Sequence, residues 1–231
     1  MQPENSQPII IAKALTRIYS VGDSEVIGIN NVDLEIAPGE IVVIKGNSGS
    51  GKSTLLSLLA GLDCPTQGEL SVADHDLNQS SEVQLTRFRR EVVGMVFQSF
   101  NLLPTLNVLE NTSLPALLAG KSLAESQNKA IDLLDWMGLK ARLSHLPAQL
   151  SGGEMQRTAI ARALINDPAI ILADEPTGNL DSRNGQIVMN LLAELNRKWG
   201  RTVMIATHSN LADSMATVKI YLKDGMITEI S

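Results

Sequence analysis

One short segment, residues 46–53, constrains this chain more than any other. Its sequence, Gly-Asn-Ser-Gly-Ser-Gly-Lys-Ser, matches the phosphate-binding template G-x-x-x-x-G-K-[ST] at every position. Glycines let the backbone turn so that successive N–H groups point inward and form a concavity suited to an anion. An apolar run at 40–45 reads as the strand that leads in, and 53–59 reads as the helix that leads out. A chance Gly/Ser-rich turn would lack this context, so the segment predicts a site for nucleotide phosphates.

The residue types in this segment also predict its chemistry. Lys52 can reach the β- and γ-phosphates, and the Ser53 hydroxyl can take one position on Mg²⁺. The start of the helix adds the positive end of its dipole. The predicted nucleotide-binding residues are Gly46, Asn47, Ser48, Gly49, Ser50, Gly51, Lys52, Ser53 and Thr54.

Composition limits the classes of function that remain. The 231 residues leave room for one large α/β domain or two smaller ones. A net charge of −6 argues against a general nucleic-acid binder, which would present a basic face. A single cysteine, Cys64, excludes an internal disulfide and suits a reducing cytoplasm. Because no apolar run is long enough to cross a bilayer and the N-terminus does not read as a signal peptide, we expect any membrane role to come through a partner chain.

Hydrophobic periodicity predicts an alternation of strands and helices. Strand patterns cover 9–19, 25–36, 40–45, 69–73, 92–97, 169–173 and 202–207, and a closing hairpin joins 217–223 to 226–230. Helical patterns cover 53–59, 82–90, 106–118, 124–137, 152–165 and 183–199. Near-continuous apolar strands alternating with helices predict a parallel sheet covered on both faces, interrupted by a helical insertion at 99–165.

Two adjacent carboxylates, Asp174 and Glu175, end the apolar strand at 169–173. Ligands of open α/β sheets bind at the carboxyl ends of the strands, so both acids should face the phosphate loop. Neighbours in a strand point to opposite sides, which suits two different roles. We expect Asp174 to hold Mg²⁺ and Glu175 to orient and deprotonate an attacking water.

The segment Leu-Ser-Gly-Gly-Glu at 150–154 predicts a second phosphate-binding helix end. Ser151 and Glu154 have the spacing of a capping box, which alone would mark a helix start. Capping does not explain Gly152 and Gly153, which cost stability in a first turn but let an anion approach the free N–H groups. Since one chain needs only one triphosphate cradle, this helix end is expected to serve an ATP bound to a neighbouring copy.

These motifs occur in the order seen in ATP-binding-cassette (ABC) ATPases, which the chain resembles over nearly its whole length. The elements that carry the resemblance are residues 46–53, Gln98, 150–154, 171–175, 178–181 and His208. The resemblance implies an α/β fold with a RecA-like core, a mixed sheet, an N-terminal antiparallel β subdomain and an inserted helical subdomain. It further implies a single domain over 1–231, with the core at about 1–98 and 166–231 and the helical subdomain at about 99–165.

The resemblance also assigns roles to single residues. Tyr19 matches the aromatic residue that stacks on adenine. Gln98 matches the residue that senses Mg²⁺ and the attacking water and links to the membrane subunit. Asp181 would communicate across a dimer in which two ATPs lie between one chain's phosphate loop and the other's 151–154 segment. His208 would contact the γ-phosphate and hold the transition-state geometry.

Finer features resemble the lipoprotein-releasing and macrolide-export group. They are residues 61–63, 88–89, 97–106, 110–111 and 176–181. Ser209 stands where the pattern usually has Asp, and 216–219 replaces a stretch that usually contains Asp-Arg. Neither departure touches the phosphates, so the resemblance still implies hydrolysis.

The resulting hypothesis is a transport ATPase subunit that drives a separate membrane subunit, contacted around Gln98–Leu106, from the cytoplasmic face of the membrane. An importer ATPase or a regulator of cell-wall enzymes is an alternative within that class. A soluble ABC ATPase acting on DNA or ribosomes would usually carry a long coiled-coil insertion or a second cassette. A small-molecule kinase would need an acceptor pocket and a lid, and would have no use for the 150–154 segment.

Overall fold

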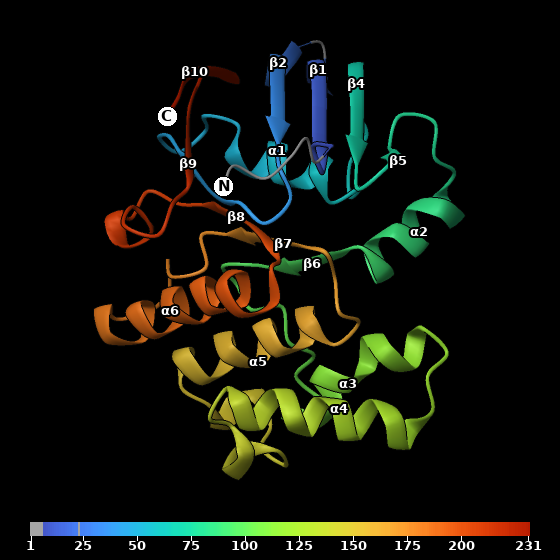
Figure 1. The fold of residues 1–231 in the computed structure, drawn as a ribbon, viewed down its shortest axis with the longest axis vertical. Coiled ribbons are helices and arrows are strands. Elements are labelled where there is room, and N and C mark those ends of the chain that lie inside the picture. The colour runs from blue at the N-terminus through green and yellow to red at the C-terminus, as the bar shows by residue number, and fades with distance from the viewer. Residues whose placement is uncertain (1–6, 23) are drawn as a thin grey trace.

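Two β-sheets lie one above the other with helix α1 (Lys52–Leu59) between them, in a computed structural model that describes residues 7–22 and 24–231 (Figure 1). The first sheet is antiparallel with strand order β2-β1-β4-β5. Its strands are β1 (Ile10–Val21), β2 (Ser24–Ile36), β4 (Gln67–Val72) and β5 (His75–Asp76).

The second sheet has strand order β10-β9-β3-β8-β7-β6 and is parallel except for β10, which pairs antiparallel with β9. Its strands are β3 (Ile41–Lys45), β6 (Val93–Val96), β7 (Ile170–Asp174), β8 (Thr202–Ala206), β9 (Val218–Lys223) and β10 (Met226–Ile230). Because β3, β8, β7 and β6 are parallel neighbours, their carboxyl ends lie along one edge of the sheet. The loops that follow these strands therefore meet there.

Alternating side chains divide the apolar interior into two clusters, one on each face of this second sheet. Val42 and Ile44 of β3 pack with α1 and the antiparallel sheet. Val43, between them, packs on the opposite face with α6 (Ser182–Trp199) and the helical insertion. This follows from the pleat of a strand, which turns successive side chains to opposite faces.

The helical insertion lies below the second sheet, on the face away from α1 (Figure 1). It contains α3 (Val108–Leu118), α4 (Leu123–Trp136) and α5 (Gly152–Leu164), while α2 (Glu82–Glu91) precedes β6. The last helix of the insertion, α5, packs on α6 and on β6, and α3 and α4 pack on α5. An apolar contact thus joins the insertion to the sheet through α5.

The predicted alternation of elements is confirmed, with boundaries that shift by a few residues. The two-residue strand β5 was not predicted, because so short a segment carries no readable periodicity. In the part of the chain that the structure describes, no helix is both long enough and apolar enough to cross a membrane.

Candidate nucleotide-binding site

The loop between β3 and α1 has a shape that only glycine permits at two of its positions. Gly51 has a φ of +104°, and a Cβ there would lie 2.4 Å from the carbonyl oxygen of Gly28 in β2. A Cβ on Gly46 would lie 2.4 Å from the carbonyl oxygen of Leu222 in β9. Any side chain at either position would push a strand away. The loop is therefore wedged between the two sheets.

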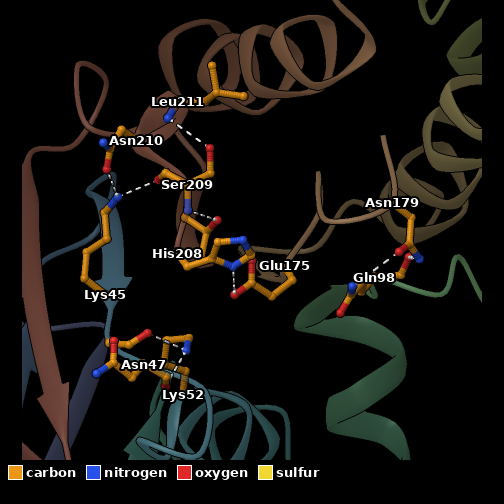
Figure 2. A network of polar contacts seen from close by, with 12 residues as sticks. Lys45, Asn47, Lys52, Gln98, Glu175, Asn179, His208, Ser209, Asn210 and Leu211 are labelled. Carbon is orange, nitrogen blue, oxygen red and sulfur yellow. Dashed lines mark hydrogen bonds and ion pairs between the residues drawn. The ribbon is translucent and has the colours of Figure 1, made fainter. Parts of the chain in front are cut away.

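Lys52 is held on this loop by the loop's own backbone. Its Nζ donates hydrogen bonds to the carbonyl oxygens of Gly46 at 2.8 Å and of Asn47 at 3.1 Å (Figure 2). The residue as a whole is 7% exposed. The ammonium group is thus fixed beside the cavity described next, where it can meet an anion.

A cavity of about 550 Å³ opens beside the loop and gathers residues from both sheets. The sequence-predicted residues that line it are Tyr19, Ser48, Gly49, Gly51, Lys52, Ser53, Thr54, Gln98, Glu175 and His208. Gly46, Asn47, Ser50 and Asp174 are not among its lining residues. Val26, Ile27 and Gly28 also line it and were not predicted. The sequence does contain a sign of them. Val26 and Ile27 are consecutive apolar residues in β2, so the alternation of a strand must turn at least one of them away from the core.

Tyr19 lies at this cavity with its hydroxyl and one ring face already engaged. The hydroxyl donates to Asp63 Oδ2 at 2.8 Å, and the Arg17 guanidinium lies 4.6 Å from the ring centroid. Arg17 in turn pairs with Asp63 at 2.7 Å. Cys64, which follows Asp63 in the sequence, is exposed. The ring orientation is therefore fixed by neighbours before any nucleotide binds.

The two acids meet the loop in a way that strand alternation does not describe. Strand β7 ends at Asp174, and Glu175 has a left-handed φ of +46°. The Glu175 N–H still continues the parallel ladder by donating to the Ala206 carbonyl oxygen at 2.8 Å, and the Glu175 carbonyl oxygen accepts from the Gly178 N–H at 3.0 Å, which closes a turn directly after the strand. We expected the two acids to be neighbours within one strand, with side chains on opposite faces. That expectation is wrong for Glu175, which lies just outside β7.

The surroundings of Asp174 fit a bound cation. Burial raises the pKa of this carboxyl, and the neighbouring charge of Glu175 raises it further, against the opposing effects of Ser53 and Lys52. Asp174 Oδ1 and Glu175 Oε2 are buried without hydrogen-bond partners in the described chain. Hydroxyl and carboxylate oxygens are the ligands Mg²⁺ prefers, so Ser53 and Asp174 together suit that ion.

His208 and Gln98 complete the edge of the cavity. The His208 Nδ1–H donates to Glu175 Oε1 at 3.0 Å, although the imidazole is 74% exposed (Figure 2). Gln98 follows β6, and its carbonyl oxygen accepts a hydrogen bond from Asn179 Nδ2 at 3.0 Å. A Cβ on Gly178 would lie 2.7 Å from Gln98 Nε2, so the absence of a side chain there admits Gln98. Segments after β6, β7 and β8 are thereby joined at one place.

The remaining predicted residues form a second group, at the N-termini of α5 and α6, outside the lining of this cavity. Ser151 and Glu154 make the predicted capping box, and Glu154 also pairs with Arg142 at 2.8 Å. Asp181 caps α6 by accepting from the backbone N–H of Asn184 at 2.8 Å. These two helix starts therefore lie together, apart from the phosphate loop.

Packing within the chain explains one of the two glycines of this group. A Cβ on Gly153 would lie 2.2 Å from Asn184 Oδ1, whereas a Cβ on Gly152 would come no closer than 3.3 Å, to Leu180 Cδ2. The Asn184 side chain of α6 thus occupies the space beside Gly153 and favours glycine there without reference to any anion. Gly152 has a looser environment, so close approach of an anion explains that glycine better than it explains Gly153.

Comparisons with known proteins agree with this arrangement. A family model described as ABC transporter matches residues 29–178. The lipoprotein-releasing system ATP-binding protein of Xanthomonas euvesicatoria pv. vesicatoria is 43% identical over 99% of this chain and 94% of that protein. The macrolide export ATP-binding/permease protein of Wolinella succinogenes is 46% identical over 96% of this chain, which spans 34% of that protein.

The likeness extends to three-dimensional structure. A solved dimeric structure of a post-hydrolysis state of an ATP-binding cassette, bound to ADP and Pi, has a TM-score of 0.90 to this chain at 42% identity. The match covers 96% of this chain and 97% of that one. It therefore includes both the cavity and the second group of residues at the starts of α5 and α6.

Proposed function

Since this chain belongs to the ABC transporter family and is an ATP-hydrolysing subunit of that class, we propose that it works as a head-to-tail dimer driving a separate membrane subunit. The proposal of a dimer rests on one observation. The phosphate loop and α1 lie on one face of the six-stranded sheet, whereas α5 packs on the other. Ser151 and Gly152 do not line the cavity beside the loop, so we assign them to the nucleotide bound by a second copy.

The cavity residues divide the work of hydrolysis. The loop N–H groups and Lys52 bind the phosphates, and Tyr19 with Val26 and Ile27 offers an apolar wall to the base. Glu175 orients the water that attacks the γ-phosphorus and accepts its proton as the bond to ADP breaks. His208, bonded to Glu175 Oε1, keeps that carboxylate in place and faces the γ-phosphate.

Mg²⁺ is the cation we propose for this site, held by Ser53 and Asp174, with Gln98 nearby. When bound, it would offset the negative charge of the β- and γ-phosphate oxygens. The unpartnered Asp174 Oδ1 supports this assignment.

Closure of the dimer is the step that couples ATP to movement. ATP gains contacts with Ser151 and Gly152 of the second copy only in the closed state, so its differential affinity shifts the equilibrium toward closure. We propose that residues 98–106, tied to 176–181 through Gln98 and Asn179, carry this motion to a membrane subunit. The chain would then lie at the inner face of the membrane, divided into a core and the helical subdomain 99–165.

Export or lipoprotein release is the transport type we propose. Its support is the length and identity of the match to the lipoprotein-releasing protein and the similar match to the macrolide-export protein. The cargo would be bound by the membrane subunit, and the cavity beside the phosphate loop would be left to the nucleotide.

Size-exclusion chromatography with light scattering on Glu175→Gln tests the proposal. This variant keeps a hydrogen-bonding side chain but removes the base, so it should bind ATP and lose turnover by roughly 100-fold or more. With ATP and Mg²⁺ it should elute as a dimer, and with ADP as a monomer. Parental turnover would refute the role of Glu175. ATP binding without dimer formation, also in the presence of the membrane subunit, would refute the shared site.

A further inference from the structure

Lys45 is a charged residue in a place where burial makes charge expensive. It is the last residue of β3, directly before Gly46, and its side chain is 11% exposed. A buried ammonium group costs several kcal/mol unless it is paired and hydrogen-bonded. The hydrolysis mechanism above makes no use of this residue.

In the part of the chain that the structure describes, every polar partner of the Lys45 ammonium comes from the segment that follows His208. Its Nζ donates to the carbonyl oxygen of Ser209 and to Asn210 Oδ1 at 3.5 Å, and it pairs with Asp213 Oδ1 at 2.6 Å. The ammonium thus makes two hydrogen bonds, and the nearby carboxylate of Asp213 balances its charge through an ion pair that lacks hydrogen-bond geometry. Figure 2 shows Lys45 reaching from β3 toward Ser209 and Asn210, beside His208.

The backbone of His208 is consequently fixed from β3 on both sides. Before it, the Thr207 N–H donates to the Ile44 carbonyl oxygen at 3.0 Å and continues the parallel ladder. After it, Lys45 binds Ser209. The imidazole itself is largely exposed, and within residues 7–22 and 24–231 Glu175 is its only hydrogen-bond partner. The position of His208 therefore depends on these two backbone anchors.

We propose that Lys45 is a positioning residue for His208, acting through its contacts with Ser209, Asn210 and Asp213. The proposal rests on the proposed role of His208 at the γ-phosphate. Because Lys45 also adjoins the phosphate loop, it sets the distance between that loop and the imidazole. A small displacement of a positioned group is enough to lower turnover by one to two orders of magnitude.

Lys45→Met tests this, since methionine has a similar length but no donor. We expect kcat for ATP to fall roughly 10-fold while ATP affinity stays within about twofold. In a His208→Ala background the same substitution should change kcat by less than about twofold, because its effect passes through the imidazole. Equal losses in both backgrounds would mean a general structural role and would overturn the proposal.

Two further variants guard against misfolding and chance effects. Asp213→Asn keeps the side-chain size and removes only the charge, so it should lower kcat in the same direction by a smaller factor. Lys13→Met removes a lysine from an exposed ion pair with Glu69 and should leave kcat unchanged. If Asp213→Asn folds but keeps full kcat, and Lys45→Met does not fold, the positioning role is refuted.

Hydrogen exchange provides a readout that does not depend on turnover. The amides of 207–213 should exchange faster in Lys45→Met, and those of 41–44 should not. Unchanged exchange in 207–213 would overturn the proposal even if kcat fell. If the parent chain hydrolysed no ATP, the proposed function would fail, and exchange alone would decide whether Lys45 anchors this segment.

Discussion

Glu154 is the residue whose ionisation contributes most clearly to the stability of the second group. Hydrogen bonds from the Ser151 backbone and then from the Arg142 side chain lower its pKa from 4.5 to about 2. A carboxyl with a lowered pKa stabilises the folded state above its unfolded pKa and loses that effect as pH falls through its folded pKa. The contribution is therefore complete at neutral pH and disappears between about pH 4.5 and pH 2.

This predicts a pH-dependent cost for Glu154→Gln. Each pKa unit corresponds to about 1.4 kcal/mol, and solvent screening of this partly exposed pair should leave about 1–2 kcal/mol of destabilisation at pH 7. Urea unfolding of both proteins should show the difference shrinking as pH falls below 4.5. Glu125→Gln, an exposed helix residue in α4, is the matched control. A difference that stays constant down to pH 3 would contradict the assignment.

At the scale of elements, the start of α5 has two features: its own side chains cap its backbone N–H groups, and it packs closely against α6. Ser151 and Glu154 satisfy the first N–H groups, and Gly153 admits the Asn184 amide. In this arrangement α5 and α6 form one surface, with Asp181 capping the second helix. The geometry of the proposed ATP contact is thus a property of two helices together.

Gly153→Ala and Gly152→Ala should consequently differ. The first forces a Cβ against Asn184 and should cost about 1–3 kcal/mol through overpacking. In the second, the added Cβ would come no closer than 3.3 Å to any neighbour, the nearest being the Leu180 side chain, and stability should change by less than about 1 kcal/mol, since alanine favours the helix. Thermal unfolding of both variants compares them directly. Equal destabilisation would mean that α5 and α6 do not pack as described.

The order of these elements could be predicted because their periodicities are strong and their motifs stand at strand and helix ends. The turn at Glu175 could not, since a left-handed φ is uncommon at a non-glycine residue and no turn residue at this position signals it. Gly153 is explained by its contact with Asn184, and Lys45 by its ion pair with Asp213. Both contacts join segments that are distant in sequence. Local patterns predict the presence of such residues, but tertiary packing decides their partners.

For the whole molecule, the proposed dimer would bring together two surfaces that lie apart in the described part of one chain. The phosphate loop lines the cavity, whereas the N-termini of α5 and α6 do not. Two copies related by a twofold axis would join these surfaces in two places at once, because such an interface uses the same surface twice. Two nucleotides would then lie in the interface rather than in the interior of either chain.

Ser151→Arg in the Glu175→Gln background tests this complementarity. The added side chain occupies the surface proposed to cover the partner's ATP, so dimer formation with ATP should be lost. ATP affinity of the monomer should stay within about twofold, because Ser151 does not line the chain's own cavity. Light scattering and nucleotide titration measure the two effects. Ser151→Thr keeps the helix cap and should still dimerise; a dimer formed by the Arg variant would contradict the shared site.

The exposed Cys64 gives the molecule a practical property. It is the chain's single cysteine, and it follows directly on Asp63, which holds the Tyr19 hydroxyl at the cavity. A thiol-reactive dye would therefore attach at one position, close to the adenine end of the proposed nucleotide site, without any engineering. The fluorescence of that dye could then report nucleotide exchange in the protein without any substitution, with one label on each chain.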